Sequence, residues 1–226
     1  MILWLRVIPC TNSGWRVFTG IVREIGVVVS AGEVLVVRAP ATAAACAPGD
    51  SVCVSGVCLT VERAEADRLR LRLMPQTSAG TTLARSAAGR RVNIEPSLRM
   101  GDQMGGHIVL GHVDAVGVVS NFRRQGDSAA LEINCPGDMM RYLAPKGSIA
   151  VDGVSLTVSR ALPSGFAVSL VKFTLENTTL DGMRAGDEVN LEADILAKYA
   201  QSALSSRGEE ERPGMTLESL VEQGYS

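Results

Sequence analysis

The stretch SVCVSGVCLTV, from Ser51 to Val61, occurs a second time as SIAVDGVSLTV, from Ser148 to Val158. The two copies lie 97 positions apart (148 − 51) and are identical at seven of eleven positions. Apolar residues recur at every second position on either side of a Ser-Gly or Asp-Gly pair, which is typical of short strands broken by a tight turn. The repeat therefore predicts similar β structure in each half of the chain.

Further matches extend this repeat. They pair Thr77 with Thr174, TTL from Thr81 with TTL from Thr178, GRRVNIE from Gly89 with GDEVNLE from Gly186 and, at an offset of 91 (111 − 20), GIVREIGVV from Gly20 with GHVDAVGVV from Gly111. One short match could arise by chance between valine-rich strands, but four collinear matches indicate a duplicated domain.

The predicted fold class is all-β, with one small antiparallel barrel in each half, because period-2 alternation dominates and helix signals are few. We expect barrels over residues 17–104 and 105–192, joined by the glycine-rich MGDQMGG from Met100. A helix is predicted over 193–205, followed by a flexible tail over 206–226. Ile195, Leu196 and Tyr199 share one face of that helix, which could pack equally well on its own barrels or on a second subunit.

Composition excludes several functional classes. A net charge of −2 gives no basic surface for nucleic acid, and no uncharged apolar run reaches the length of a membrane span. The five cysteines are odd in number and form no CxxC pair, so reduced thiols in a cytoplasmic protein are expected. With only His107 and His112 available, a histidine-rich metal site is excluded.

Polar residues cluster around the repeated motifs. They are Ser51, Cys58 and Thr60 in the first half, Lys146, Ser155 and Thr157 in the second, and His107 and His112 in GGHIVLGH at the junction. Each also has a structural interpretation: a strand threonine bonds locally, Cys58 fills a core, His107 is a satisfied structural histidine and Lys146 lies in a turn. The copies differ, since Cys58 aligns with Ser155 and Ser55 with Asp152. Two similar but unequal pockets suit two copies of one ligand, one as donor and one as acceptor.

At these residues the chain resembles the alpha-type riboflavin synthase family. The resemblance rests on FTGIVREIG from Phe18, GDSVCVSGVCLTV from Gly49, GDQMGGHIVLGHVDAVG from Gly101, YLAPKGSIAVDGVSLTV from Tyr142, TLENTTL from Thr174 and GDEVNLEADILAKY from Gly186. It implies two tandem six-stranded Greek-key barrels, a C-terminal helix that assembles a homotrimer, and an active site between the first barrel of one subunit and the second barrel of a neighbour. It also implies dismutation of two molecules of 6,7-dimethyl-8-ribityllumazine without metal or redox cofactor.

The same resemblance implies the site residues. The polar participants in catalysis would be Ser51, Cys58, His112, Thr157 and Asp194. The substrate-contacting strands would supply Gly20, Ile21 and Val22; Cys58, Leu59 and Thr60; Arg72, Leu73, Met74, Pro75, Gln76 and Thr77; Gly111, His112 and Val113; Lys146; Ser155, Leu156 and Thr157; and Ser169, Leu170, Val171, Lys172, Phe173 and Thr174. The resemblance leaves open whether the trimer associates with a shell of lumazine synthase.

Departures from the family pattern are local. Ser55 stands where the family usually has Asn, Gln76 and Ser78 alter the contacts after Met74, and Lys172 and Phe173 replace the usual proline and a polar residue. The family begins with Met directly before FTGIV, where this chain has Val17, so residues 1–16 are interpreted as translated upstream sequence. The alternative function is a non-catalytic lumazine- or flavin-binding paralogue of the antenna type.

Overall fold

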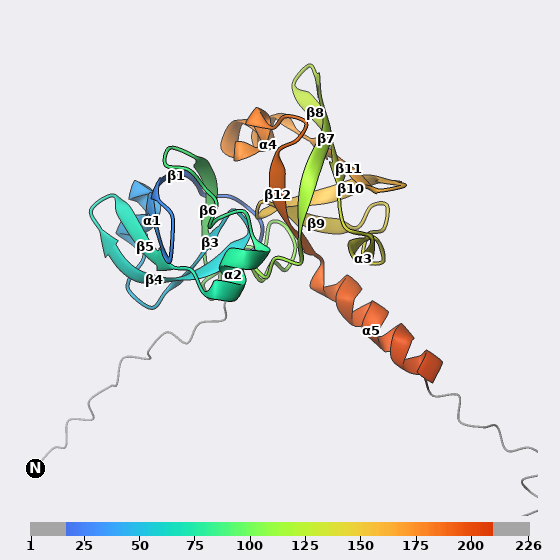
Figure 1. Cartoon of the computed structure of the whole chain (residues 1–226), viewed down its shortest axis with the longest axis horizontal. Helices are drawn as coiled ribbons and strands as arrows, with labels where there is room; N and C mark the ends of the chain where they lie inside the picture. The colour runs from blue at the N-terminus through green and yellow to red at the C-terminus, as the bar shows by residue number, and fades with distance from the viewer. Residues whose placement is uncertain (1–16, 210–226) are drawn as a thin grey trace, which may run out of the picture.

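The computed structural model describes residues 17–209 of the chain. Two closed antiparallel barrels lie side by side, and a helix at the C-terminal end projects away from them (Figure 1). The expected upstream segment, residues 1–16, and the part of the expected tail from 210 onward lie outside the described residues.

The two barrels have the same topology. The first comprises β1 (Glu24–Ser30), β2 (Val34–Arg38), β3 (Ser51–Val54), β4 (Val57–Glu65), β5 (Arg68–Arg72) and β6 (Arg91–Pro96), in the closed order β1-β2-β5-β4-β3-β6. The second comprises β7 (Ala115–Gln125), β8 (Ser128–Asn134), β9 (Ser148–Val151), β10 (Val154–Leu162), β11 (Gly165–Leu170) and β12 (Glu188–Ala193), in the equivalent order. The predicted pair of six-stranded barrels is confirmed.

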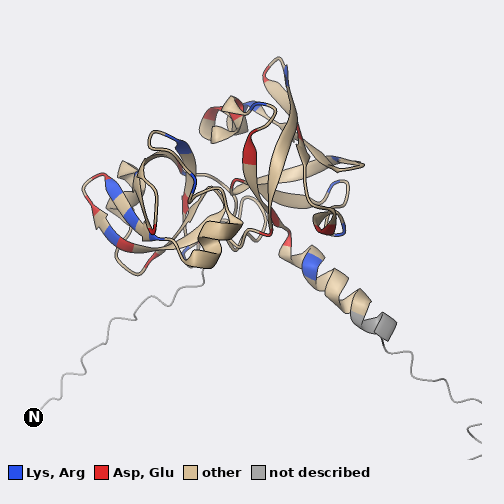
Figure 2. Cartoon of the chain, viewed as in Figure 1, with Lys and Arg blue, Asp and Glu red and all other residues tan. Residues whose placement is uncertain are grey.

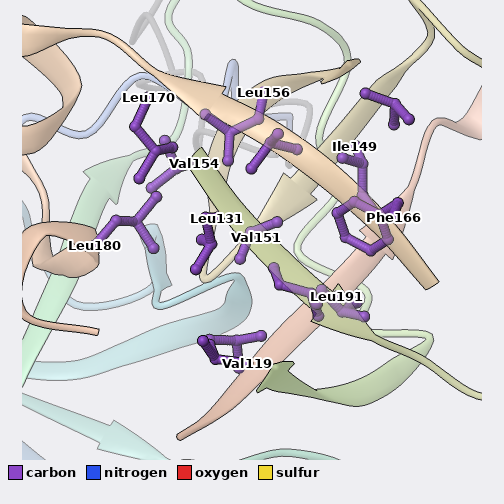
Figure 3. Packing of buried hydrophobic residues seen from close by; sticks show 14 of the residues in the cluster. Val119, Leu131, Ile149, Val151, Val154, Leu156, Phe166, Leu170, Leu180 and Leu191 are labelled. Carbon is purple, nitrogen blue, oxygen red and sulfur yellow. The ribbon is translucent and has the colours of Figure 1, made fainter. Parts of the chain in front are cut away.

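Alternation along the strands fills each barrel. On β5, Leu69 and Leu71 are fully buried, whereas Arg68, Arg70 and Arg72 between and beside them are exposed. The second core is built in the same way from Leu131, Ile149, Phe166 and other apolar side chains that converge on the barrel axis (Figure 3). Closing each sheet on itself leaves no free edge strand and gives every alternate residue an interior to occupy.

Irregularities recur at equivalent places in the two barrels. The strand register shifts after Val28 and Val61 in the first barrel, and after Val119 and Val158 in the second. These pairs are separated by 91 and 97 positions, the same two offsets as in the sequence repeat. The duplication therefore preserves the β-bulges that bend the strands around each barrel.

Helices are short except at the C-terminus. They are α1 (Pro40–Ala45), α2 (Pro75–Gly80), α3 (Gly137–Met140), α4 (Lys172–Asn177), the 3-10 helix η1 (Thr179–Gly182) and α5 (Ile195–Glu209). The prediction that Arg72–Thr77 and Ser169–Thr174 are strands throughout was wrong. β5 ends at Arg72 and β11 at Leu170, and the chain turns into α2 and α4. Pro75 favours this change, because its fixed φ suits the first turn of a helix and its nitrogen offers no strand hydrogen bond.

The predicted C-terminal helix is present as α5, which begins one residue after Asp194 and runs four residues beyond the expected end at 205. Leu196, Tyr199 and Leu204 are exposed by 62%, 67% and 65% of their surface. Lys198 is the single charged residue between positions 195 and 205, and most of the described helix is accordingly uncharged in Figure 2. This chain's own barrels therefore leave much of the apolar surface of α5 uncovered.

Candidate functional site

The segments that precede β1 and β7 cross between the barrels. The Gly20 carbonyl accepts a hydrogen bond of 2.8 Å from the backbone N–H of Ser155, and the Gly111 carbonyl accepts one of 2.9 Å from the N–H of Cys58. Val22 accordingly packs against the core of the second barrel, and Val113 against the core of the first. Each candidate pocket is thus built from one barrel and a segment that leads into the other.

Two buried glutamates hold these crossing segments. Glu95 accepts hydrogen bonds from the backbone N–H groups of Thr19 (2.7 Å) and Gly20 (2.9 Å). Glu192 occupies the equivalent place and accepts from Leu110 (2.8 Å), Gly111 (2.9 Å) and His112 (3.1 Å). Both lie in the repeated VNIE and VNLE motifs, so the repeat was the signal that could have identified them as paired anchors.

The turns of the β3–β4 and β9–β10 hairpins lie against each other, since a Cβ on Gly56 would lie 2.9 Å from the backbone N of Gly153. Asn93 donates to the Asp152 carbonyl (2.9 Å), and Asn190 donates to the Ser55 carbonyl (2.8 Å). The side chains of Ser55 and Asp152 are almost fully buried and accept from the backbone N–H groups of Asn93 and Asn190. The difference between Ser55 and Asp152 therefore belongs to the interface between the barrels, where both side chains are turn anchors.

The first candidate pocket surrounds the β3–β4 hairpin. Ser51 lies opposite Thr60 in the strand register, and Cys58 lies beside Gly111. Thr60 and His112 are exposed, Cys58 is half-buried, and Ser51 is only 6% exposed. The structure thus brings Ser51, Cys58 and His112 of the predicted catalytic residues to the same barrel.

The second candidate pocket repeats this arrangement around β9 and β10. Thr157 lies opposite Ser148, and Ser155 lies beside Gly20. Asp194 follows directly after β12, and its side chain accepts a hydrogen bond from the Leu196 N–H at the start of α5. Thr157 and Asp194 therefore belong to a different barrel from the other three predicted catalytic residues, and Asp194 also caps a helix.

His107 belongs to this second pocket, although it was not among the site residues predicted from the sequence. Its Nδ1 lies 2.7 Å from the Ser155 hydroxyl, and its Nε2 is buried without a hydrogen-bond partner in the described structure. Burial lowers the pKa of His107, and the charge of Asp194 opposes that shift. The described residues therefore satisfy only one of the two ring nitrogens of His107, which departs from the interpretation of a fully hydrogen-bonded structural histidine.

The remaining predicted contacts divide by burial. The leucines at 59, 73, 156 and 170 point into the barrel cores, so only their backbones can meet a ligand. The exposed positions are Thr60, Arg72, Met74, Pro75, Gln76, His112, Lys146, Thr157, Ser169, Val171, Lys172 and Phe173. The half-buried ones are Ile21, Val22, Cys58, Thr77, Val113, Ser155, Thr174 and Asp194. Lys146 lies in a turn with a φ of 69°, the place that Gly49 takes in the first barrel.

Within residues 17–209, no group of three or more His, Cys, Asp or Glu side chains could hold a metal ion. In the same range, no helix is both long and apolar enough to span a membrane.

One hollow of about 420 Å³ lies beside β6 and is lined by Arg23, Glu95, Ser97 and Arg99 among others. It contains none of the predicted substrate contacts. A single chain presents the two candidate pockets as open surfaces rather than as that cavity.

We expect Gly111→Ala to destabilise the protein by about 3 kcal/mol, because positive φ is costly for alanine and a well-packed contact cannot absorb a methyl group. Gly111 has a φ of +72°, and a Cβ there would lie 2.6 Å from the backbone N of Cys58. Gly89→Ala is the matched control, since Gly89 has a φ of +90° but open space around it. Urea unfolding at fixed protein concentration measures both losses, and equal losses would contradict the close approach.

Burial raises the pKa of Glu192 to about 7, against the opposing hydrogen bonds of Leu110 and Gly111 and the charge of Lys198. A folded pKa above the unfolded one means that the native state binds the proton more tightly. This group's stabilisation is therefore full below about pH 4.5 and is lost as the pH rises through about 7.

We expect Glu192→Gln to flatten the dependence of unfolding free energy on pH. Between pH 5 and 8, wild type should lose about 2 kcal/mol more than the variant, measured by urea unfolding. Asp152, whose pKa is raised by burial to about 6, contributes the same slope to both proteins. The exposed Glu188→Gln is the control and should keep the wild-type slope; an unchanged slope in Glu192→Gln would refute the assignment.

The comparisons with known proteins agree with this duplicated architecture. A family model described as the lumazine binding domain matches the chain twice, over residues 19–97 and 110–194. Crystal structures of LumP complexed with riboflavin and with 6,7-dimethyl-8-(1'-D-ribityl) lumazine share the fold, with TM-scores of 0.73 and 0.71 at 23% and 24% identity, over 78% of this chain and 98% of theirs. The fold and the paired pockets thus define a double lumazine-binding-domain protein.

Curated relatives narrow this class. The riboflavin synthase of Mycobacterium tuberculosis (strain ATCC 25618 / H37Rv) is 40% identical over 200 residues, 84% of this chain and 100% of that protein. Those of Brucella abortus (strain 2308) and Schizosaccharomyces pombe are 36% and 32% identical, over 81% and 84% of this chain and 96% and 94% of theirs. The chain belongs to the riboflavin synthase family, and as a member it is an enzyme of the transferase class.

Proposed function

We propose that the protein transfers a four-carbon unit between two molecules of 6,7-dimethyl-8-ribityllumazine, giving riboflavin and 5-amino-6-(D-ribitylamino)uracil. The observation that carries the proposal is the pair of equivalent pockets, each made by a β-hairpin and a crossing segment, with Cys58 beside Gly111 in one and Ser155 beside Gly20 in the other. Two similar planar substrates require two similar pockets, and unequal residues in them allow one substrate to donate and the other to accept.

The chemistry needs a base and an activated acceptor. The C7 methyl group of the lumazine is acidic because the ring delocalises the carbanion, so a well-placed imidazole can remove its proton. His112 is exposed at the first pocket, where its backbone is fixed by Glu192, and is the proposed base. In the second pocket, Ser155, hydrogen-bonded to His107, and the exposed Thr157 are the hydroxyl residues proposed to bind the other substrate. Holding both lumazine rings in one site replaces a rare encounter in solution and lowers the activation barrier of the transfer.

The active site proposed here lies between two chains. The five predicted catalytic residues divide between the two pockets of one chain, with Ser51, Cys58 and His112 at the first and Thr157 and Asp194 at the second. A homotrimer in which the first barrel of one subunit faces the second barrel of its neighbour would join the two sets. The exposed apolar residues of α5 support a helical contact between subunits.

The proposal extends to the cellular setting. Among residues 17–209, no two cysteines form a disulfide, which suits a reducing cytoplasm. A lumazine synthase would supply the substrate, because the product of that enzyme is the lumazine. Co-elution of the two purified proteins tests whether they associate.

Incubation of the purified protein with the lumazine tests the reaction directly. We expect flavin absorbance to appear at half the molar amount of lumazine consumed, because two substrates give one riboflavin. Binding of lumazine without any flavin formation would overturn the enzymatic proposal and favour the antenna-type alternative.

A further inference from the structure

Two cysteines face each other across the first hairpin. In the register of β3 and β4, Cys53 lies directly opposite Cys58. The N–H of Cys58 points out of the hairpin and donates to the Gly111 carbonyl, so the two cysteines form a non-hydrogen-bonded pair. Opposed residues at such a pair share one face of the sheet, and their Cα atoms lie about 4.5 Å apart.

This spacing suits a disulfide, which bridges Cα atoms about 4.4 to 6.8 Å apart. Both side chains are thiols in this structure. The hairpin register already holds the two cysteines opposite each other.

The surroundings give the two thiols different roles. Cys53 is 2% exposed and lies in the apolar cluster between the barrels with Phe18, Val109 and Ala150, against which Cys58 packs. Burial, with the nearby carboxylates Glu95 and Glu192, raises the pKa of Cys53 well above its usual range. Cys53 is therefore inert by itself, whereas the half-buried Cys58 is the thiol that a small molecule can reach.

Only the first barrel contains this pair. At the equivalent register position of the second barrel, Ala150 lies opposite Ser155. The repeat thus supplies a natural version of the same hairpin without thiols, and that version packs well with alanine at the inner position.

We propose that Cys53 and Cys58 form an oxidation site, at which a peroxide converts the pair to a disulfide. The Cys58 sulfur attacks the O–O bond, the peroxide is reduced, and Cys58 becomes a sulfenic acid with release of one water. The Cys53 sulfur then attacks the Cys58 sulfur, loses its proton and displaces the hydroxyl as a second water. Two thiols and one hydrogen peroxide give one disulfide and two waters, and the two electrons pass from sulfur to peroxide.

The disulfide removes the Cys58 thiol from the first pocket and should stop turnover. This consequence rests on the proposed function, whereas formation of the disulfide does not. A thiol reductant would restore the pocket, so the modification is reversible, as expected of transient disulfides in a reducing compartment.

Differential alkylation of the peroxide-treated full-length protein tests the disulfide. Trypsin releases residues 39–63 as one peptide with Cys46, Cys53 and Cys58. After peroxide treatment, we expect only Cys46 to take up the label and the peptide to be two hydrogen atoms lighter. Labelling of both Cys53 and Cys58 in a sample that peroxide has inactivated would overturn the proposal.

Cys53→Ala, which copies Ala150 of the second barrel, is the matched variant for activity. Wild type and the control Cys46→Ala should lose most of their turnover in prolonged peroxide treatment and regain it with dithiothreitol. In Cys53→Ala the Cys58 sulfenic acid meets no second thiol and is oxidised further to sulfinic acid, so dithiothreitol should not restore its turnover. An equally reversible loss in Cys53→Ala would overturn the pair as the oxidation site. A complete disulfide with full turnover would support the site but refute the proposed role of Cys58, so the two ideas fail separately.

Discussion

Replacing both Leu196 and Tyr199 with aspartate is expected to convert the proposed trimer into monomers without measurable turnover. Both side chains are mostly exposed on α5, and a helical contact between subunits would bury them. Two carboxylates cannot enter such an apolar contact without a large desolvation penalty. Sedimentation velocity would show the mass falling from three chains to one, and turnover would fall with it because each proposed active site uses two chains.

A control with the same added charge separates assembly from general electrostatics. Ser30, at the end of β1, and Ala66, in the turn between β4 and β5, are exposed in the first barrel, and Ser30→Asp with Ala66→Asp should leave both mass and turnover unchanged. A trimer that persists in the Leu196→Asp, Tyr199→Asp protein would refute α5 as the subunit contact. Circular dichroism confirms that the barrels remain folded in each variant.

His112→Ala is expected to lower kcat by about 10²- to 10⁴-fold, the range of a lost general base, while KM changes little. The imidazole is proposed to act on charge that develops during the reaction, so its loss should affect the transition state more than the bound substrate. Steady-state kinetics with the lumazine measures both constants. Ile21→Ala is the control, because Ile21 holds the equivalent position at the second pocket, lacks any acid-base group and should chiefly raise KM.

Cys58→Ser should show the same division between kcat and KM, since the serine keeps the size of the side chain but not the thiol. The second barrel already carries Ser155 at the equivalent place, so the hairpin accommodates serine. Wild-type turnover in both His112→Ala and Cys58→Ser would remove the two residues from the mechanism.

The barrels could be predicted because their signal is local and repeated. Leu69 and Leu71 alternate with arginines, and the same alternation recurs in the second half, so period 2 predicts strands without any knowledge of their partners. The ends of those strands were less predictable. Met74 and Val171 continue the extended backbone, but α2 and α4 follow at once, and whether a short segment extends or coils depends on the barrel that it closes.

The candidate site could be predicted only in part. The motifs around Cys58 and Thr157 were recognised from their repetition, which already assigned them to different halves of the chain. The sequence did not indicate which junction residue meets which half, and the structure pairs His107 with Ser155, 48 positions away. Such a pairing depends on where the linker returns after β6, which no periodicity records.

The sequence by itself determined that this protein is a duplicated, all-β chain with a terminal apolar helix, because alternation and self-similarity are properties of residue order. Only the tertiary structure decided how the halves are joined. Glu95 and Glu192 draw the segments around Gly20 and Gly111 across to the opposite barrel, where two glycine carbonyls accept the N–H groups of Ser155 and Cys58. That contact requires a glycine with positive φ, a buried carboxylate and a strand from the other barrel to meet at one point, and only folding in three dimensions brings them together.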